Sequence, residues 1–171
     1  FIIETIKNIK ETNNQSQCVL IPRHVSRTQD IINLLKENNL TWQLRTNQTN
    51  SLDNADIFIL NTYGEAKEIF KKNKLVFLGG SIISHGGQNP LEPAREGCIL
   101  FHGPHIYNFE EIYEFLQKNN IAHLTSTPKI LANQLLKNHN NQPDNKKFVE
   151  IINQHGQKIL IDHINYLNSF I

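Results

Sequence analysis

The chain of 171 residues contains no methionine, only two cysteines and one tryptophan. No apolar run approaches the about 20 residues of a membrane-spanning helix, and no signal-peptide pattern is recognisable. A basic block is also lacking, since 17 Lys and Arg stand against 16 Asp and Glu, for a net charge of +1. We therefore expect no nucleic-acid partner. An anionic small ligand remains compatible with this balance, because it needs only local positive groups.

The two cysteines and the absence of methionine lead to two further expectations. Cys18 and Cys98 each lie in an apolar, strand-like run, which favours two buried free thiols in a reducing compartment over a disulfide. The chain begins at Phe1, and an initiator methionine is not normally removed before so bulky a residue. We expect the sequence to be a fragment of a longer protein.

Short apolar runs alternate with amphipathic stretches along the whole chain. This alternation predicts an α/β fold with a doubly wound, Rossmann-like parallel sheet. The runs are continuously apolar, as expected for strands covered on both faces. The expected strands are 18–21, 41–44, 57–60, 75–78, 98–101 and 121–124, and the clearest expected helices are 27–37 and 109–117.

Several helix boundaries are readable from capping residues. Gly97 is expected to end a short helix, and Asn108 to cap the helix from Phe109, with Glu111 completing a capping box. Thr127 followed by a proline predicts another helix start. The polar stretch 138–143 is expected to be a linker.

Two helices, 146–154 and 158–170, are expected after the linker. The second carries an apolar stripe, formed by Leu160, Ile164, Leu167 and Ile171. Two interpretations of this stripe are open: it packs on the chain's own sheet, or it docks on another domain.

Four polar or glycine-rich clusters follow expected strands. In an open parallel sheet, ligands bind beyond the carboxyl ends of the strands, so we expect these clusters on one edge. The most informative of them is the segment 79–97, in which a strand runs into Gly-rich turns and then a helix start, a place where α/β proteins bind phosphate and ribose. The clusters are 22–24, 61–65, 79–97 and 102–108.

Glu92 lies between two prolines at that helix start and has two interpretations. Its carboxylate can accept hydrogen bonds from both hydroxyls of a ribose. Alternatively, Asn89 caps the helix, Pro90 is its first residue and Glu92 merely completes a capping box. The spacing alone leaves both open.

The other residues of this edge also have a ligand-binding and a structural interpretation. Arg23 can pair with a phosphate or a pyrimidine carbonyl, or be a surface residue. Gly86 and Gly87 can form an anion-binding nest or an ordinary turn. A ligand-binding and a structural interpretation are likewise open for Gly64, Glu65, His85 and His105.

Metal and nucleophile chemistry have weaker support. His85, His102 and His105 are expected on one edge, but no Cys pair or HxxxH spacing indicates zinc. No Ser-His-Asp pattern, GxGxxG motif or Walker motif occurs. We expect no metal and no cofactor.

Six motifs together resemble the 3-deoxy-D-manno-oct-2-ulosonic acid (Kdo) transferases of lipopolysaccharide synthesis. They stand in that family's order and spacing, from about residue 18 to 137, and the HGGxNPLEP run is the most specific of them. The motifs are Pro22-Arg23-His24 with Arg27, Tyr63-Gly64-Glu65, Gly79-Gly80-Ser81, His85 to Pro93, Gly103-Pro104-His105, and Asn108-Phe109.

The resemblance implies the C-terminal, donor-binding domain of a two-domain GT-B glycosyltransferase, covering residues 1–171 with C-terminal helices in 144–171. Its donor would be CMP-Kdo, and its acceptor the lipid A precursor at the cytoplasmic face of the bacterial inner membrane. The implied CMP contacts are Pro22, Arg23, Tyr63, Gly64, Glu65, Asn89, Pro90, Leu91 and Glu92. Phosphate or sugar contacts are further proposed for Ser81, His85, Gly86, Gly87 and Gln88.

The sequence departs from the family pattern in two mild ways: Gln88 stands where His is common, and Ala66 where Leu is common. The resemblance also implies that several parts lie outside this chain. These are the first strand of the donor domain, the general base, the acceptor site and the membrane-associating surface. No catalytic residue is therefore expected here, and the fragment itself is expected to be soluble.

Two alternatives come from other classes. A sugar-nucleotide epimerase of the same architecture would bind a UDP-linked sugar instead. A non-catalytic nucleotide-binding or interaction module would share the fold without the reaction.

Overall fold

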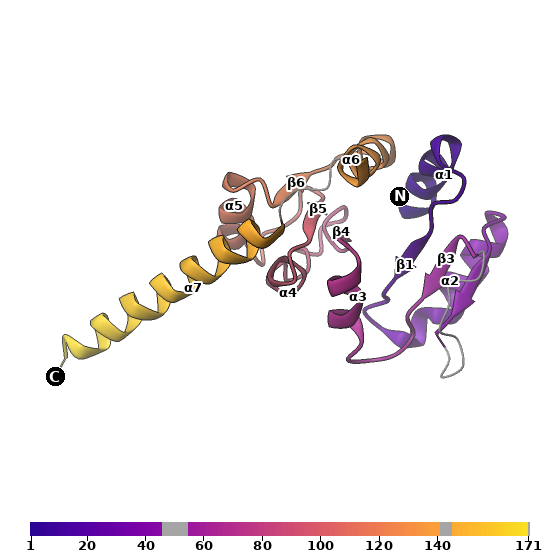
Figure 1. Ribbon diagram of the computed structural model, residues 1–171. Coiled ribbons are helices and arrows are strands. Elements are labelled where there is room, and N and C mark those ends of the chain that lie inside the picture. The colour runs from indigo at the N-terminus through magenta and orange to yellow at the C-terminus, as the bar shows by residue number, and fades with distance from the viewer. Residues whose placement is uncertain (46–54, 141–144, 171) are drawn as a thin grey trace. The chain divides into compact units, whose positions relative to one another are not determined.

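A computed structural model describes residues 1–45, 55–140 and 145–170. The chain divides into two compact units: Phe1–Ala66 with Thr127–Leu136, and Lys67–Ser126 with Lys137–Ile171. Helices and strands largely alternate in sequence order (Figure 1), and every described strand pairing is parallel. The predicted α/β class is confirmed. The strands form two three-stranded sheets, one in each unit.

The first unit contains a sheet of order β1-β3-β2. Its central strand β3 is buried at all three residues, whereas the outer strands are half-buried. Helices α1 and α2 contribute Ile6, Ile32 and Leu35 to the core against β3. The elements are α1 Ile2–Thr12, β1 Cys18–Leu20, a 3-10 turn Val25–Arg27, α2 Thr28–Glu37, β2 Trp42–Leu44 and β3 Ile57–Ile59.

The second unit repeats this plan with the order β4-β5-β6. The central strand β5 is again buried at every residue, including its last, His102. A central strand covered on both faces favours apolar residues, which explains the apolar runs in the sequence. The elements are α3 Ala66–Lys72, β4 Leu75–Leu78, α4 Leu91–Arg95, β5 Ile99–His102, α5 Glu110–Lys118, β6 Ala122–Leu124 and α7 Asn145–Asn168, while α6 Pro128–Asn140 spans the boundary between the units.

All six predicted strands are present, with ends that differ by a residue at most. Both thiols are free, and burial raises the pKa of Cys18 and of Cys98 to about 11. Gly97 follows α4 in a left-handed conformation, with φ of +76°, as its predicted helix-ending role requires. Helix α6 begins at Pro128, and the Thr127 hydroxyl accepts a hydrogen bond from the Ile130 N–H at 3.2 Å.

Two local predictions are wrong. Residues 138–140 of the expected linker belong to α6, while 141–143 lie outside the described residues. The two expected C-terminal helices are one continuous helix, α7. A Cβ placed on Gly156 would meet nothing within 4 Å, and a single glycine inside a helix weakens the helix without ending it.

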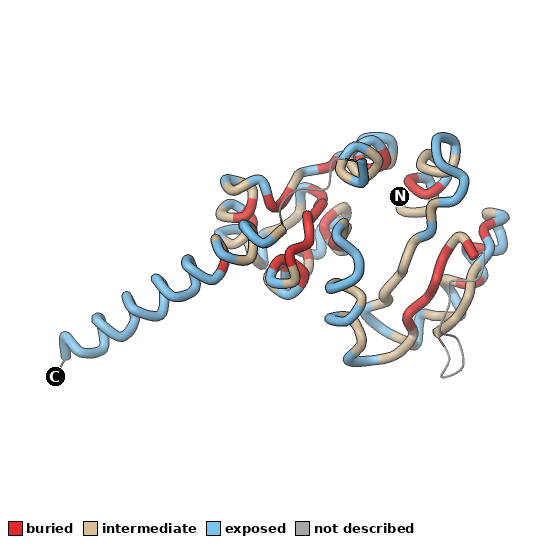
Figure 2. Tube along the Cα trace, viewed as in Figure 1, coloured by how far each residue is buried: buried red, intermediate tan, exposed pale blue. Residues whose placement is uncertain are grey.

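Helix α7 is attached to the second unit only near its beginning. Ile152 is buried in the core, and the His155 ring stacks on Phe115 with centroids 3.8 Å apart. Beyond this point the helix is exposed (Figure 2), and the apolar stripe with it: Leu160, Ile164 and Leu167 are 60%, 47% and 64% exposed. Ile171 lies outside the described residues. The described part of the stripe therefore does not pack on the chain's own sheet, and docking on another domain stays a prediction.

Candidate functional site

In the first unit, three loops leave the same edge of the sheet. Leu20 and Leu44 both pair with Ile59, so β1, β2 and β3 end side by side. The segments 22–24 and 61–65 follow two of these ends, as predicted. Arg45 directly follows the third, and its N–H donates to Ile59 O at 2.9 Å.

Most predicted contacts in this unit are open to solvent. Arg23 and Gly64 are exposed, Pro22 is half-buried, and the Tyr63 side chain is 79% exposed. Gly64 has φ of +83°, and a Cβ placed on it would meet nothing within 4 Å. The glycine is therefore needed for its backbone conformation, and the space beside it is open to a ligand.

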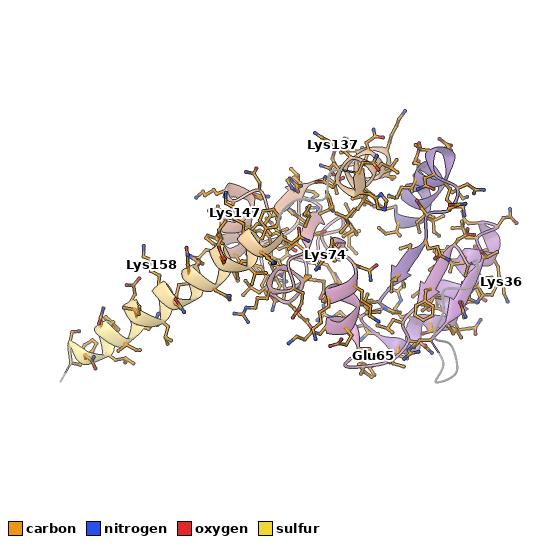
Figure 3. All side chains as sticks on the ribbon, viewed as in Figure 1. Lys36, Glu65, Lys74, Lys137, Lys147 and Lys158 are labelled. Carbon is orange, nitrogen blue, oxygen red and sulfur yellow. The ribbon has the colours of Figure 1, made fainter. Side chains whose placement is uncertain are left out.

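Glu65 differs from its neighbours because protein groups already hold its carboxylate. The Thr62 hydroxyl donates to one oxygen at 2.6 Å, and Arg45 Nε donates to the other at 3.1 Å. These two donors lower the pKa of Glu65. Figure 3 labels Glu65 where the chain enters α3. The geometry favours a role for Glu65 in ordering the 61–65 loop.

Replacing Thr62 by Val will raise the pKa of Glu65 toward its ordinary value, because the first of its two donors is lost. A depressed folded-state pKa stabilises the fold above the unfolded-state pKa, and this stabilisation disappears as the pH falls through the folded-state pKa. Wild type and variant will therefore differ most in unfolding free energy near neutral pH and converge in acid. Carboxyl ¹³C titration measures the shift, with Glu68 as an internal control that should not move. An unchanged Glu65 pKa would contradict the assignment.

In the second unit, the loops after β4 and β5 are joined by hydrogen bonds. Ser81 is fully buried; its hydroxyl donates to Leu78 O at 2.7 Å and accepts from the Gly103 N–H at 2.8 Å. The Ser81 carbonyl accepts from the His105 N–H at 2.9 Å. These bonds give Ser81 a structural role, in place of the phosphate or sugar contact expected for its side chain.

A second group of hydrogen bonds holds the turn at Gly86 and Gly87, here called the glycine turn. Gly87 donates its N–H to Gly80 O at 3.1 Å, and Asn108 donates its N–H to Gly86 O and its amide to His85 O, both at 3.2 Å. The Gly87 N–H thus already donates to a group of the protein, which argues against an anion-binding nest at Gly86 and Gly87. The predicted capping role of Asn108 is wrong: α5 starts at Glu110 with no side-chain cap, and the Asn108 amide holds the glycine turn instead.

The segment 89–92 opens helix α4. Asn89 Oδ1 accepts the Leu91 N–H at 3.0 Å, Pro90 is the N-cap residue, and the Leu91 side chain packs against the core. Glu92 is the second helical residue, so the predicted capping box does not form. Within the described part of the chain, no hydrogen bond or ion pair involves the exposed Glu92 carboxylate. That arrangement leaves Glu92 available to a ligand.

The three histidines considered for metal binding are not equivalent. His102 is fully buried and both ring nitrogens have partners within the protein, whereas His85 is exposed and His105 half-buried. No group of three or more potential metal ligands occurs among the described residues. Nor does any described helix have both the length and the apolar character that crossing a membrane requires.

The predicted CMP contacts are divided between the two units. Pro22, Arg23 and the 63–65 turn belong to the first, and the 89–92 segment belongs to the second. In each unit they follow the carboxyl ends of parallel strands. Their convergence on one nucleotide stays a prediction.

Comparison with known proteins identifies the family. No family model matches the chain. The 3-deoxy-D-manno-octulosonic acid transferase of Rickettsia typhi is 33% identical over 180 residues, which cover 99% of this chain and 38% of the relative. The enzyme of the same name from Rickettsia prowazekii is 31% identical over 177 residues, again 99% of this chain and 38% of the relative. The chain belongs to the 3-deoxy-D-manno-octulosonic acid transferase family. It spans somewhat more than a third of the length of these two family members.

A solved structure has the same fold. The C-terminal CMP-Kdo binding domain of WaaA from Acinetobacter baumannii superimposes with a TM-score of 0.78, at 19% identity. The match covers 90% of this chain and 80% of that domain. The resemblance inferred from the six motifs is thus confirmed for the family and the fold.

Proposed function

We propose that the chain is the donor-binding domain of a Kdo transferase and that it binds CMP-Kdo through its cytidine monophosphate part. The match to transferases of this name over 99% of the chain carries the proposal. The exposed Glu92 carboxylate in the Gly-rich segment, which has no partner among the described residues, supports it, because a nucleotide site needs polar groups that the fold has not already used. The structural neighbour from Acinetobacter baumannii is itself a CMP-Kdo binding domain.

Each proposed contact has a physical task. Glu92 accepts hydrogen bonds from the two ribose hydroxyls, and a charged acceptor strengthens such bonds. Arg23 is the only proposed CMP contact with a permanent positive charge, so it pairs with the phosphate or with a cytosine carbonyl. The helix-start N–H groups contribute less than expected, because Pro90 has none and the Leu91 N–H is held by Asn89.

In the whole protein, the domain would hold the donor so that its anomeric carbon faces an acceptor hydroxyl. Its contribution would be positioning, together with charge stabilisation of the departing CMP. The acceptor would be the lipid A precursor at the cytoplasmic face of the inner membrane. The general base and the membrane-associating surface would belong to parts of the protein outside these residues. Accordingly, we propose no catalytic residue, metal or cofactor in this chain.

Calorimetric titration of the chain with CMP and with UDP tests the proposal. We expect weak binding of CMP and none of UDP, because the family resemblance implies a CMP-linked donor. Preference for UDP would favour the sugar-nucleotide epimerase, and binding of neither would favour a module without this ligand. Addition of a Kdo acceptor together with CMP-Kdo should yield no product from the chain alone.

A further inference from the structure

A largely buried polar group is hydrogen-bonded to the segment 88–92, which carries Asn89 and Glu92. It consists of His102 at the end of β5 and of Tyr113 and Gln117 on α5. His102 and Tyr113 are both fully buried, and their rings are in contact with centroids 4.5 Å apart. The function proposed above does not use these three side chains.

The hydrogen bonds of His102 define its protonation state. The ring Nδ1 lies 2.8 Å from Gly103 O, which can only accept, so Nδ1 carries the proton. The amide of Gln117 donates to Nε2 at 2.9 Å, so Nε2 is the unprotonated acceptor. Burial, the main cause, lowers the pKa of His102 and keeps the ring neutral. Both nitrogens are thereby satisfied, and the ring is held in one orientation against Tyr113.

Tyr113 connects this group to the loop above it. Its hydroxyl donates to the backbone carbonyl of Gln88 at 3.0 Å. Burial raises the pKa of Tyr113, so the hydroxyl stays protonated and able to donate. Among the described residues, this is the only hydrogen bond that joins 88–92 to another helix or loop.

Among the described residues, the hydrogen bonds that join the loop after β4 to the loop after β5 all lie earlier in the first of these loops. On that side they involve Ser81, Ser84, His85 and Gly86, which precede the proposed CMP contacts at Asn89 and Glu92. Within the described part of the chain, the peptide between Gln88 and Asn89 has one hydrogen bond, from the Tyr113 hydroxyl to the Gln88 carbonyl. Its orientation sets the direction of the Asn89 side chain, which caps Leu91, and hence the start of α4 with Glu92.

We propose that Tyr113, kept in place by His102 and Gln117, is a positioning residue for the nucleotide. It orders the 88–92 segment before the ligand arrives, so that the free energy of ordering this segment is not lost from binding. This inference rests on the proposed function, since the ligand is the cytidine nucleotide of that proposal. Removing the hydroxyl should leave the site residues intact but loosen the segment that carries two of them.

Tyr113→Phe tests the proposal, because it removes one oxygen and keeps the ring against His102. Tyr107→Phe is the matched control: its hydroxyl donates to Ser84 O at 3.2 Å, in the same loop but ahead of the glycine turn. Two quantities are measured for each variant: amide hydrogen exchange of residues 88–92 without nucleotide, and the CMP dissociation constant. A melting curve checks that both variants fold.

We expect Tyr113→Phe to speed exchange at Asn89 and Leu91 and to raise the CMP dissociation constant about fivefold, as loss of one neutral hydrogen bond would. Tyr107→Phe should change neither quantity. In a Glu92→Ala background the effect of Tyr113→Phe on affinity should shrink, because both act through the same segment.

Different results would contradict the positioning role of Tyr113 and the proposed function. Unchanged exchange at 88–92 in Tyr113→Phe overturns the positioning role whether or not CMP binds. Faster exchange with unchanged CMP affinity also overturns it. Absence of CMP binding by the wild-type chain overturns the proposed function, and with it the assignment of a nucleotide to this segment.

Discussion

Replacing Glu92 by Ala will weaken CMP binding by roughly ten- to a hundredfold. This loss of affinity corresponds to the free energy of hydrogen bonds from two ribose hydroxyls to a carboxylate. The same change should leave the free energy of unfolding nearly unaltered. Glu92 is exposed, and within the described residues its carboxylate has no hydrogen-bond or ion-pair partner whose loss would destabilise the fold. Calorimetry with CMP and thermal unfolding of the same samples measure the two effects.

The matched control for this prediction is Glu110→Ala. Glu110 is also an exposed acidic residue in the first turn of a helix of the second unit, but it belongs to α5. It should change CMP affinity little. Equal affinity of wild type and Glu92→Ala would remove Glu92 from the site and restore its interpretation as a residue of the helix start.

Replacing Gly103 by Ala will destabilise the second unit by about 3 kcal/mol, at the upper end of typical overpacking costs. A Cβ at this position would overlap the Ser81 carbonyl oxygen and lie 2.6 Å from its carbon. The obstacle is backbone, which cannot rotate away as a flexible side chain would. Relief requires separating the two loops, at the expense of the bonds from Gly103 and His105 to Ser81. Urea unfolding measures the loss.

Gly79→Ala is the control for Gly103→Ala, because it makes the same chemical change in the partner loop. Its added Cβ would meet nothing within 4 Å, and its φ is not in the left-handed region. Stability should therefore change little. If Gly103→Ala were as stable as Gly79→Ala, the two loops would not be held together as closely as the structure indicates.

Sequence patterns predicted the elements of this fold well, because those patterns are local. A strand buried on both faces favours consecutive apolar residues, as in 57–59 and 99–101, and a capping side chain favours a helix start, as at Thr127. The Gly-rich segment was informative for the same reason, since left-handed turns at Gly86 and Gly87 need glycine.

Predictions that depended on a distant partner fared worse. Asn108 was expected to cap its own helix, but its amide is used by a turn that lies more than twenty residues earlier. The ion pair of Arg45 with Glu65 was missed. Arg45 directly follows a predicted strand, and the carboxyl ends of parallel strands lie at one edge of the sheet, so this pair could have been predicted. Helix α7 runs through Gly156 because a single glycine lowers helix stability without forbidding the helix.

For this protein, the amino-acid sequence by itself determined the family, the α/β class and the segments that carry the proposed nucleotide contacts. These follow from short-range patterns of residue type and spacing. Only the tertiary structure decided which polar groups are already in use: Ser81, Glu65 and the Gly87 N–H have partners within the protein, whereas the Glu92 carboxylate has none among the described residues. The reason is physical, because a hydrogen bond depends on the position of both partners, and that position is set by how segments far apart along the chain pack together.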